Sequence, residues 1–154
     1  MVDIELDADE FAGLEFFFDK YGQVWMSEMS ASLATAAEII RGWLEDYTPR
    51  RTGTTATSWR VIAFDRNDYD ISNLNEPIIT FLTEGTRPHR IPTSGNTLLH
   101  WTDNEGFDHF AMHVQHLGTE PIDIVGQALD AAEPELEELW DAADDAASRD
   151  MGFK

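Results

Sequence analysis

Residues 26–64 read MSEMSASLATAAEIIRGWLEDYTPRRTGTTATSWRVIAF, a helix pattern followed by a stop and a strand pattern. Apolar residues recur every three or four positions in the first half, which predicts one buried helix face. This stripe comprises Met26, Met29, Leu33, Ala36, Ile40, Trp43 and Tyr47. Thr48-Pro49 predicts the helix end, because a residue before proline avoids the α region. Residues 57–64 are rich in β-branched and aromatic side chains, which predicts a strand with Trp59 facing inward.

The residues before this stretch predict a less regular beginning. Val2, Ile4 and Leu6 alternate with acids, which is typical of a strand or an extended arm. Asp7 and Glu10 resemble a capping box at the start of a short helix, and Gly22 is expected to end or bend it. We therefore expect an arm and a short helix over 1–22 and a longer helix over 23–47.

The residues after it predict strands and a last helix. A polar turn at 65–68 should lead to a return strand over 69–74, and Glu76-Pro77 should open a helical turn. Residues 85–92 are expected to form a loop, and 96–102 and 107–116 two strands around a turn. The last helix should begin with Pro121 in its first turn and kink or restart at Pro134. Its expected apolar stripe is Val125, Leu129, Ala132, Leu136, Leu139, Ala143 and Ala147.

The order of these elements predicts the fold class. Helices, then strands, then a helix indicate an α+β fold in a single domain over 1–154. We expect a small antiparallel sheet of four to five strands, packed against a long N-terminal and a kinked C-terminal helix. The sheet and its loops should span 48–118, and the last helix 119–148.

Composition excludes several classes of protein. The 154 residues include no Cys, which excludes disulfide bonds, thiolate zinc sites and a Cys nucleophile. No apolar run is long enough to span a membrane, so no membrane association is expected. The N-terminus has neither the basic start nor the apolar core of a signal peptide.

The net charge is −20, and it is unevenly distributed. Residues 48–118 are nearly balanced at −2, so the flanking helices carry −18. Such a field repels phosphate and disfavours nucleic-acid binding. Molar salt screens charges beyond about 3 Å, so the composition suits a salty cytoplasm. An acidic protein of ordinary habitat and a DNA-mimicking inhibitor are the alternatives.

Catalytic and metal motifs are missing from the sequence. The chain has no P-loop, dinucleotide fingerprint, zinc-protease motif or nucleophile elbow. His109 and His113 on one strand would lie about 13 Å apart, too far to share a metal ion. A metal hydrolase, the enzymatic alternative, would require His100, His109 and His113 to converge. We expect no catalytic residue, no cofactor and no metal.

Two loops concentrate cations in a chain that has few. Residues 48–53 include Arg50 and Arg51, and residues 84–92 include Arg87 and Arg90. These Arg could pair with acids of a neighbouring copy or with acids of their own subunit.

The same loops carry a family resemblance. Residues 48–59, TPRRTGTTATSW, resemble the pattern T-P-x-x-T-G-x-L-x-x-S-W, with Thr55 in place of Leu. Residues 81–92, FLTEGTRPHRIP, resemble E-x-G-T-x-P-H-x-I-P with one residue fewer after Glu84. Residues 116–121, HLGTEP, resemble H-P-G-T-x-P with Leu117 for the first Pro. In order and spacing, residues 24–130 are similar to the tail-component (gene product ten type) family of tailed double-stranded-DNA viruses.

This resemblance implies a structural role. Members are head-tail joining or tail-completion proteins with an α+β fold and no catalytic residues. It implies a hexameric ring in the neck or upper tail of the virion, assembled in the host cytoplasm. The partners would be other copies and the neck, portal-adaptor and tail-tube proteins, with double-stranded DNA passing through the lumen without specific binding. Together with the acidic composition, it suggests a virus of a halophilic archaeon.

The motif positions are the expected subunit-contact residues. They are Thr48, Pro49, Arg50, Arg51, Thr52, Gly53, Trp59, Glu84, Gly85, Thr86, Arg87, Pro88, His89, Arg90, Pro92, His116, Gly118 and Thr119.

Overall fold

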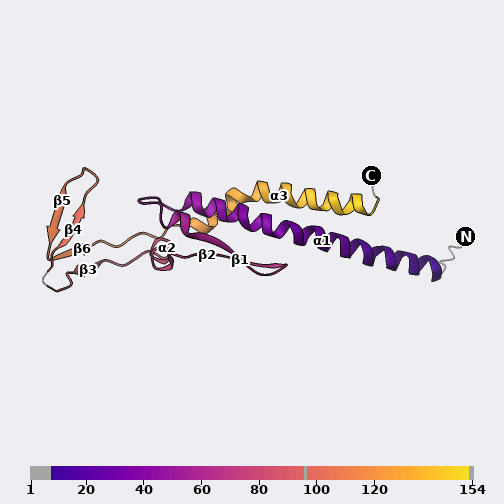
Figure 1. Ribbon diagram of the computed structural model, residues 1–154, viewed down its shortest axis with the longest axis horizontal. Helices are drawn as coiled ribbons and strands as arrows, with labels where there is room; N and C mark the ends of the chain where they lie inside the picture. The colour runs from indigo at the N-terminus through magenta and orange to yellow at the C-terminus, as the bar shows by residue number, and fades with distance from the viewer. Residues whose placement is uncertain (1–7, 96, 153–154) are drawn as a thin grey trace, which may run out of the picture. The chain divides into compact units, whose positions relative to one another are not determined.

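The computed structural model describes residues 8–95 and 97–152, and it has the predicted α+β composition (Figure 1). The chain falls into two compact units, each described by itself below. Unit 1 comprises residues 1–74 and 125–154, and unit 2 comprises residues 75–124. The expected arm at residues 2–6 and the capping residue Asp7 lie outside the described residues.

Unit 1 begins with one long helix, α1 (Ala8–Tyr47). The predicted helix end before Thr48-Pro49 is confirmed. The predicted boundary at Gly22 is wrong, since α1 continues through it. A glycine inside a helix costs only about 1 kcal/mol relative to alanine, which the surrounding helical residues can offset.

The last helix, α3 (Ile124–Asp150), runs beside α1 in the opposite direction (Figure 1). Trp25 Nε1 donates a hydrogen bond to Asp144 Oδ1 at 3.1 Å, and Trp43 Nε1 donates to Glu135 Oε1 at 2.9 Å. α3 begins after Pro121, so the prediction that Pro121 lies in its first turn is wrong. The helix also continues through Pro134 without a restart. A proline removes one backbone hydrogen bond, and that loss does not end this helix.

Most of the buried residues among the described residues of α1 and α3 are alanines. The fully or nearly buried members are Ala36, Ala37, Ala128, Ala132, Ala143 and Ala147. Three of the seven predicted stripe positions of α3 are among them, but Val125 and Leu129 are 48% and 45% exposed. Val125 and Leu129 therefore remain accessible near the start of α3, whereas Ile124 is fully buried.

The described strands form three separate antiparallel pairs instead of one sheet of four to five strands. In unit 1, β1 (Trp59–Asp65) pairs with β2 (Asp68–Asn73), close to the predicted strands. These two strands and the short 3-10 helix η1 (Ala56–Ser58) contact α1.

Unit 2 contains α2 (Glu76–Thr83), β3 (His89–Pro92), β4 (Leu99–Thr102), β5 (Asp108–Ala111) and β6 (His113–His116). The predicted helical turn after Glu76 is confirmed. The predicted loop over 85–92 contains β3, which pairs with β6. The predicted strand over 107–116 divides at Met112 into β5 and β6, because the two parts pair with different strands.

Candidate functional site

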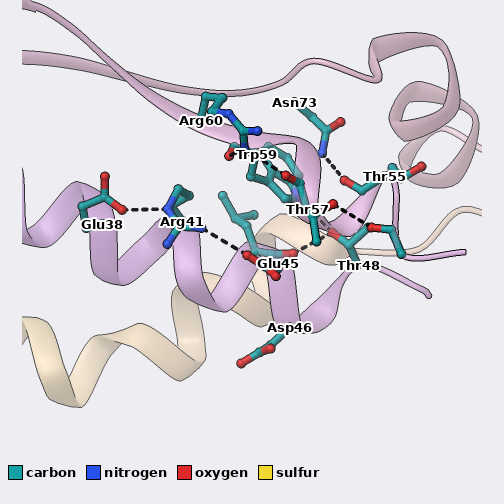
Figure 2. Close-up of polar contacts among 12 residues, drawn as sticks. Glu38, Arg41, Glu45, Asp46, Thr48, Thr55, Thr57, Trp59, Arg60 and Asn73 are labelled. Carbon is teal, nitrogen blue, oxygen red and sulfur yellow. Dashed lines mark hydrogen bonds and ion pairs between the residues drawn. The ribbon is translucent and has the colours of Figure 1, made fainter.

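A buried hydrogen bond joins the two ends of the first motif (Figure 2). Thr48 is 1% exposed, and its Oγ1 donates to the carbonyl of Leu44 at 2.6 Å. The same oxygen accepts a hydrogen bond from Trp59 Nε1 at 2.9 Å, and Trp59 is 6% exposed. The predicted inward position of Trp59 is confirmed. The two ends of the motif therefore meet in the interior of unit 1.

Hydroxyl groups close the loop between these two ends. Thr57 Oγ1 donates to the carbonyl of Gly53 at 3.1 Å, and Ser58 Oγ donates to that of Thr54 at 2.6 Å. Thr52 Oγ1 donates to Thr54 Oγ1 at 3.2 Å, while Pro49 is exposed. The Thr and Ser residues thus shape the loop itself.

Arg50 and Arg51 differ in their contacts. The Arg50 guanidinium lies 3.0 Å from Asp46 Oδ1 and 3.7 Å from Glu45 Oε1. Arg50 thus fits the alternative of pairing within its own subunit, whereas Arg51 is exposed and forms no ion pair with the described residues. Glu45 also contacts Arg41 at 3.2 Å (Figure 2).

The second and third motifs meet within unit 2. Thr86 N–H donates to the carbonyl of Thr119 at 2.9 Å, and Thr119 N–H donates to that of Thr86 at 3.1 Å. Each Thr follows a glycine with a positive φ, +72° at Gly85 and +92° at Gly118. We call Gly85, Thr86, Gly118 and Thr119 the clasp.

Both clasp glycines are required by space as well as by φ. A Cβ on Gly85 would lie 2.5 Å from the carbonyl oxygen of Thr119. A Cβ on Gly118 would overlap the carbonyl oxygen of Thr86. Only glycine fits at either position, which explains the glycine of each motif.

The clasp leads directly into the β3–β6 ladder. His89 pairs with His116, and their ring centroids lie 5.0 Å apart. His89 Nδ1 donates to the carbonyl of Arg87 at 2.8 Å, and His116 Nδ1 accepts from Gly118 N–H at 3.1 Å. These two rings therefore order the backbone on both sides of the clasp.

An open, largely apolar groove of about 530 Å³ lies against the clasp. We call it the clasp groove; its lining residues are Phe81, Thr86, Arg87, His89, Ile91, His116 and Thr119. Arg87 and Arg90 are exposed and form no ion pair with the described residues. Glu84, Pro88 and Pro92 are exposed motif residues outside its lining.

The β4–β5 hairpin contains two exposed His–Asp pairs. His109 Nε2 lies 2.8 Å from Asp103 Oδ2, and His100 Nε2 lies 3.0 Å from Asp108 Oδ1. The hydrogen bond from His109, aided by Phe107 N–H, lowers the pKa of Asp103. The Thr102 hydroxyl, followed by His100, lowers the pKa of Asp108.

The histidines do not converge on a metal site. His100 and His109 contact different carboxylates, and His113 belongs to another strand pair. No group of three or more potential ligands is arranged for a metal ion within residues 8–95 and 97–152. The convergence required by the metal-hydrolase alternative is absent there.

Side chains of α3 line a second groove, which was not predicted from the sequence. Its volume is about 410 Å³, and we call it the α3 groove. Its lining residues are Leu129, Asp130, Glu133, Leu136, Glu137 and Trp140. The acids recur at helical spacing beside Leu129 and Leu136, and this spacing is the sequence signal for the groove.

Comparisons with known proteins add no relative. No family model, curated protein or solved structure matches the chain. None of the described helices has the length and apolar character that crossing a membrane requires.

Proposed function

We propose that this chain is a structural virion protein, a ring-forming connector that joins the capsid portal complex to the tail tube. The clasp is the observation that supports this most. Two segments that resemble the same virion family meet there through paired hydrogen bonds and two obligatory glycines. Positions that carry the resemblance in these two segments therefore contact each other in the folded chain.

The exposed apolar side chains of unit 2 favour a role in assembly. Ile79 and Ile124 are the large apolar residues buried among its described residues. The β4–β5 region instead exposes Leu98, Trp101, Phe107, Phe110 and Met112. Apolar groups gathered on a surface are typical of protein contacts. In this proposal, neck proteins or other copies cover them.

The acidic charge is compatible with a DNA conduit. A net charge of −20 repels phosphate, so duplex DNA would pass through a hexameric ring without binding to it. The protein would act in the neck or upper tail and would need no catalytic group.

The test of this function uses virus particles. A virus whose only copy carries Arg51, Arg87 and Arg90 all changed to Glu should produce filled or leaky heads separated from tails. Arg149→Glu, a charge reversal on α3 that belongs to neither loop, is the control and should leave particles joined. Imaging of particles with this chain labelled should place it on the axis at the neck. The proposal would be contradicted if the label lay elsewhere on the particle. It would also be contradicted if the triple variant produced joined and infectious particles.

A further inference from the structure

The α3 groove combines an apolar floor with an acidic rim. Leu129, 45% exposed, lies there with Leu136 and Trp140. Asp130, Glu133 and Glu137 border them and form no ion pair with the described residues. An occupant must therefore bring apolar side chains to the floor and a cation to the rim. A surface with another acid would be repelled.

Cations are scarce in this chain. It has 10 Lys and Arg against 30 acids. Arg41 pairs with Glu38 at 2.7 Å and Arg50 with Asp46 at 3.0 Å. Arg60 donates to the carbonyl of Trp59 at 2.7 Å. Arg51, Arg87, Arg90 and Arg149 form no ion pair with the described residues, and among these four Arg87 lines the largely apolar clasp groove.

The clasp groove has the chemistry that the α3 groove requires. Phe81, 52% exposed, and Ile91 provide apolar side chains beside Arg87. The backbone at Arg87 is also fixed, because its carbonyl accepts from His89 and Gly118 packs against it. A cation held on an ordered backbone loses less conformational entropy on binding than one on a free loop.

We propose that the α3 groove of one copy receives side chains that line the clasp groove of a second copy, with Phe81 and Ile91 against its floor and Arg87 against the rim of Asp130, Glu133 and Glu137. Different surfaces of the two copies meet, so the contact is heterologous and repeats around a ring if the rotation closes. Apolar contacts with Phe81 and Ile91 would supply most of the attachment, and the charges would fix its register. This inference deepens the proposed function by naming the surfaces that close the ring.

The absence of Cys allows a direct test by cross-linking. Full-length Arg87→Cys and Glu133→Cys variants are mixed in molar KCl, where long-range repulsion is screened, and treated with a short flexible bismaleimide. We expect a cross-linked dimer in the mixture, at least fivefold more abundant than with either variant alone. A chain with both substitutions should give a ladder of products that ends at a closed ring.

Glu138→Cys is the matched control, because Glu138 is an exposed acid of α3 outside the groove. Paired with Arg87→Cys, it should give little dimer. Equal cross-linking from both partners would mean random collision and would overturn the inference. An internal cross-link in the double variant, without dimer in the mixture, would overturn it too. If the mixture stays monomeric while the chain still occupies the virion neck, these surfaces do not meet and the proposed function stands.

Discussion

The hydrogen bond between Trp59 and Thr48 joins the end of α1 to the start of β1 at a buried site. Because both side chains are almost fully buried, neither can exchange its partner for water. The indole also fills the space between these elements, so it contributes packing as well as a hydrogen bond.

Trp59→Ala should lower the free energy of unfolding by about 3–5 kcal/mol, the usual cost of removing a buried Trp. Denaturant unfolding measures this directly. Trp101→Ala, at a Trp that is 39% exposed, is the control and should cost much less. A loss below about 1 kcal/mol at Trp59 would mean that its side chain is not part of the core.

Substitution of two glycines by alanine separates the cost of a positive φ from the cost of steric overlap. Gly85→Ala adds a positive-φ cost of about 1–2 kcal/mol and also a clash with Thr119. Gly106→Ala has a similar φ of +90°, but nothing lies within 4 Å of its added Cβ. We expect protection of the Thr86 and Thr119 amides against hydrogen exchange to fall about tenfold more in Gly85→Ala than in Gly106→Ala. Equal effects in both variants would show that the clasp is not closely packed.

At the scale of elements, the β4–β5 hairpin has little packing to support it. An isolated two-stranded hairpin is marginally stable in water, and this one exposes most of its large side chains. Its order depends on cross-strand pairs, such as the stacked rings of Trp101 and His109, 5.2 Å apart. Asp103 stabilises the turn between the two strands, because its Oδ1 accepts hydrogen bonds from the N–H groups of Glu105 and Phe107, each at 2.9 Å.

The hairpin should therefore loosen in acid. The pKa of Asp103 is lowered in the folded chain, so its contribution is complete above the unfolded value of about 3.9. That contribution is lost as the pH falls through the lower folded pKa. NMR contacts between Trp101 and His109 should weaken below about pH 4 in the parent protein. Asp103→Asn, which cannot titrate, should reduce this pH dependence and leave the part that belongs to Asp108, whose pKa is also lowered. A pH dependence that is the same in the variant would assign it to another group.

Local signals in the sequence predicted some elements and not others. The end of α1 was predictable because Pro49 acts on its immediate neighbour. The pairing of β3 with β6 was not, because it depends on the approach of Gly85 to Thr119. The motif residues were predictable as a set, yet only the structure separates the buried Thr48 from the exposed Arg87. Periodicity predicted the apolar side of α3, but not that Leu129 would be left accessible.

At the scale of the whole molecule, the net charge of −20 dominates. Most of it lies in unit 1, where α3 carries many exposed acids with few cations nearby. Such charges repel one another at low ionic strength and are screened within about 3 Å at 1 M salt.

The thermal midpoint should therefore rise as KCl increases from low to molar concentration. A variant with Glu138→Gln, Asp141→Asn and Asp145→Asn removes exposed acids outside the α3 groove. We expect it to be more stable than the parent in low salt and to show a smaller rise. A parent midpoint that is flat or falls with KCl would defeat the interpretation of a salt-adapted protein.

The 33-residue separation of Thr86 and Thr119 has a consequence for the order of folding. The β4–β5 hairpin joins residues that are close in the sequence, and it can form within about 1–10 μs. Pairing of the two threonines is slower, because it must close the long loop that contains the hairpin. The hairpin should therefore form early and the loop should close late. Because the hairpin has few buried contacts, it should also open and re-form while the paired threonines stay closed.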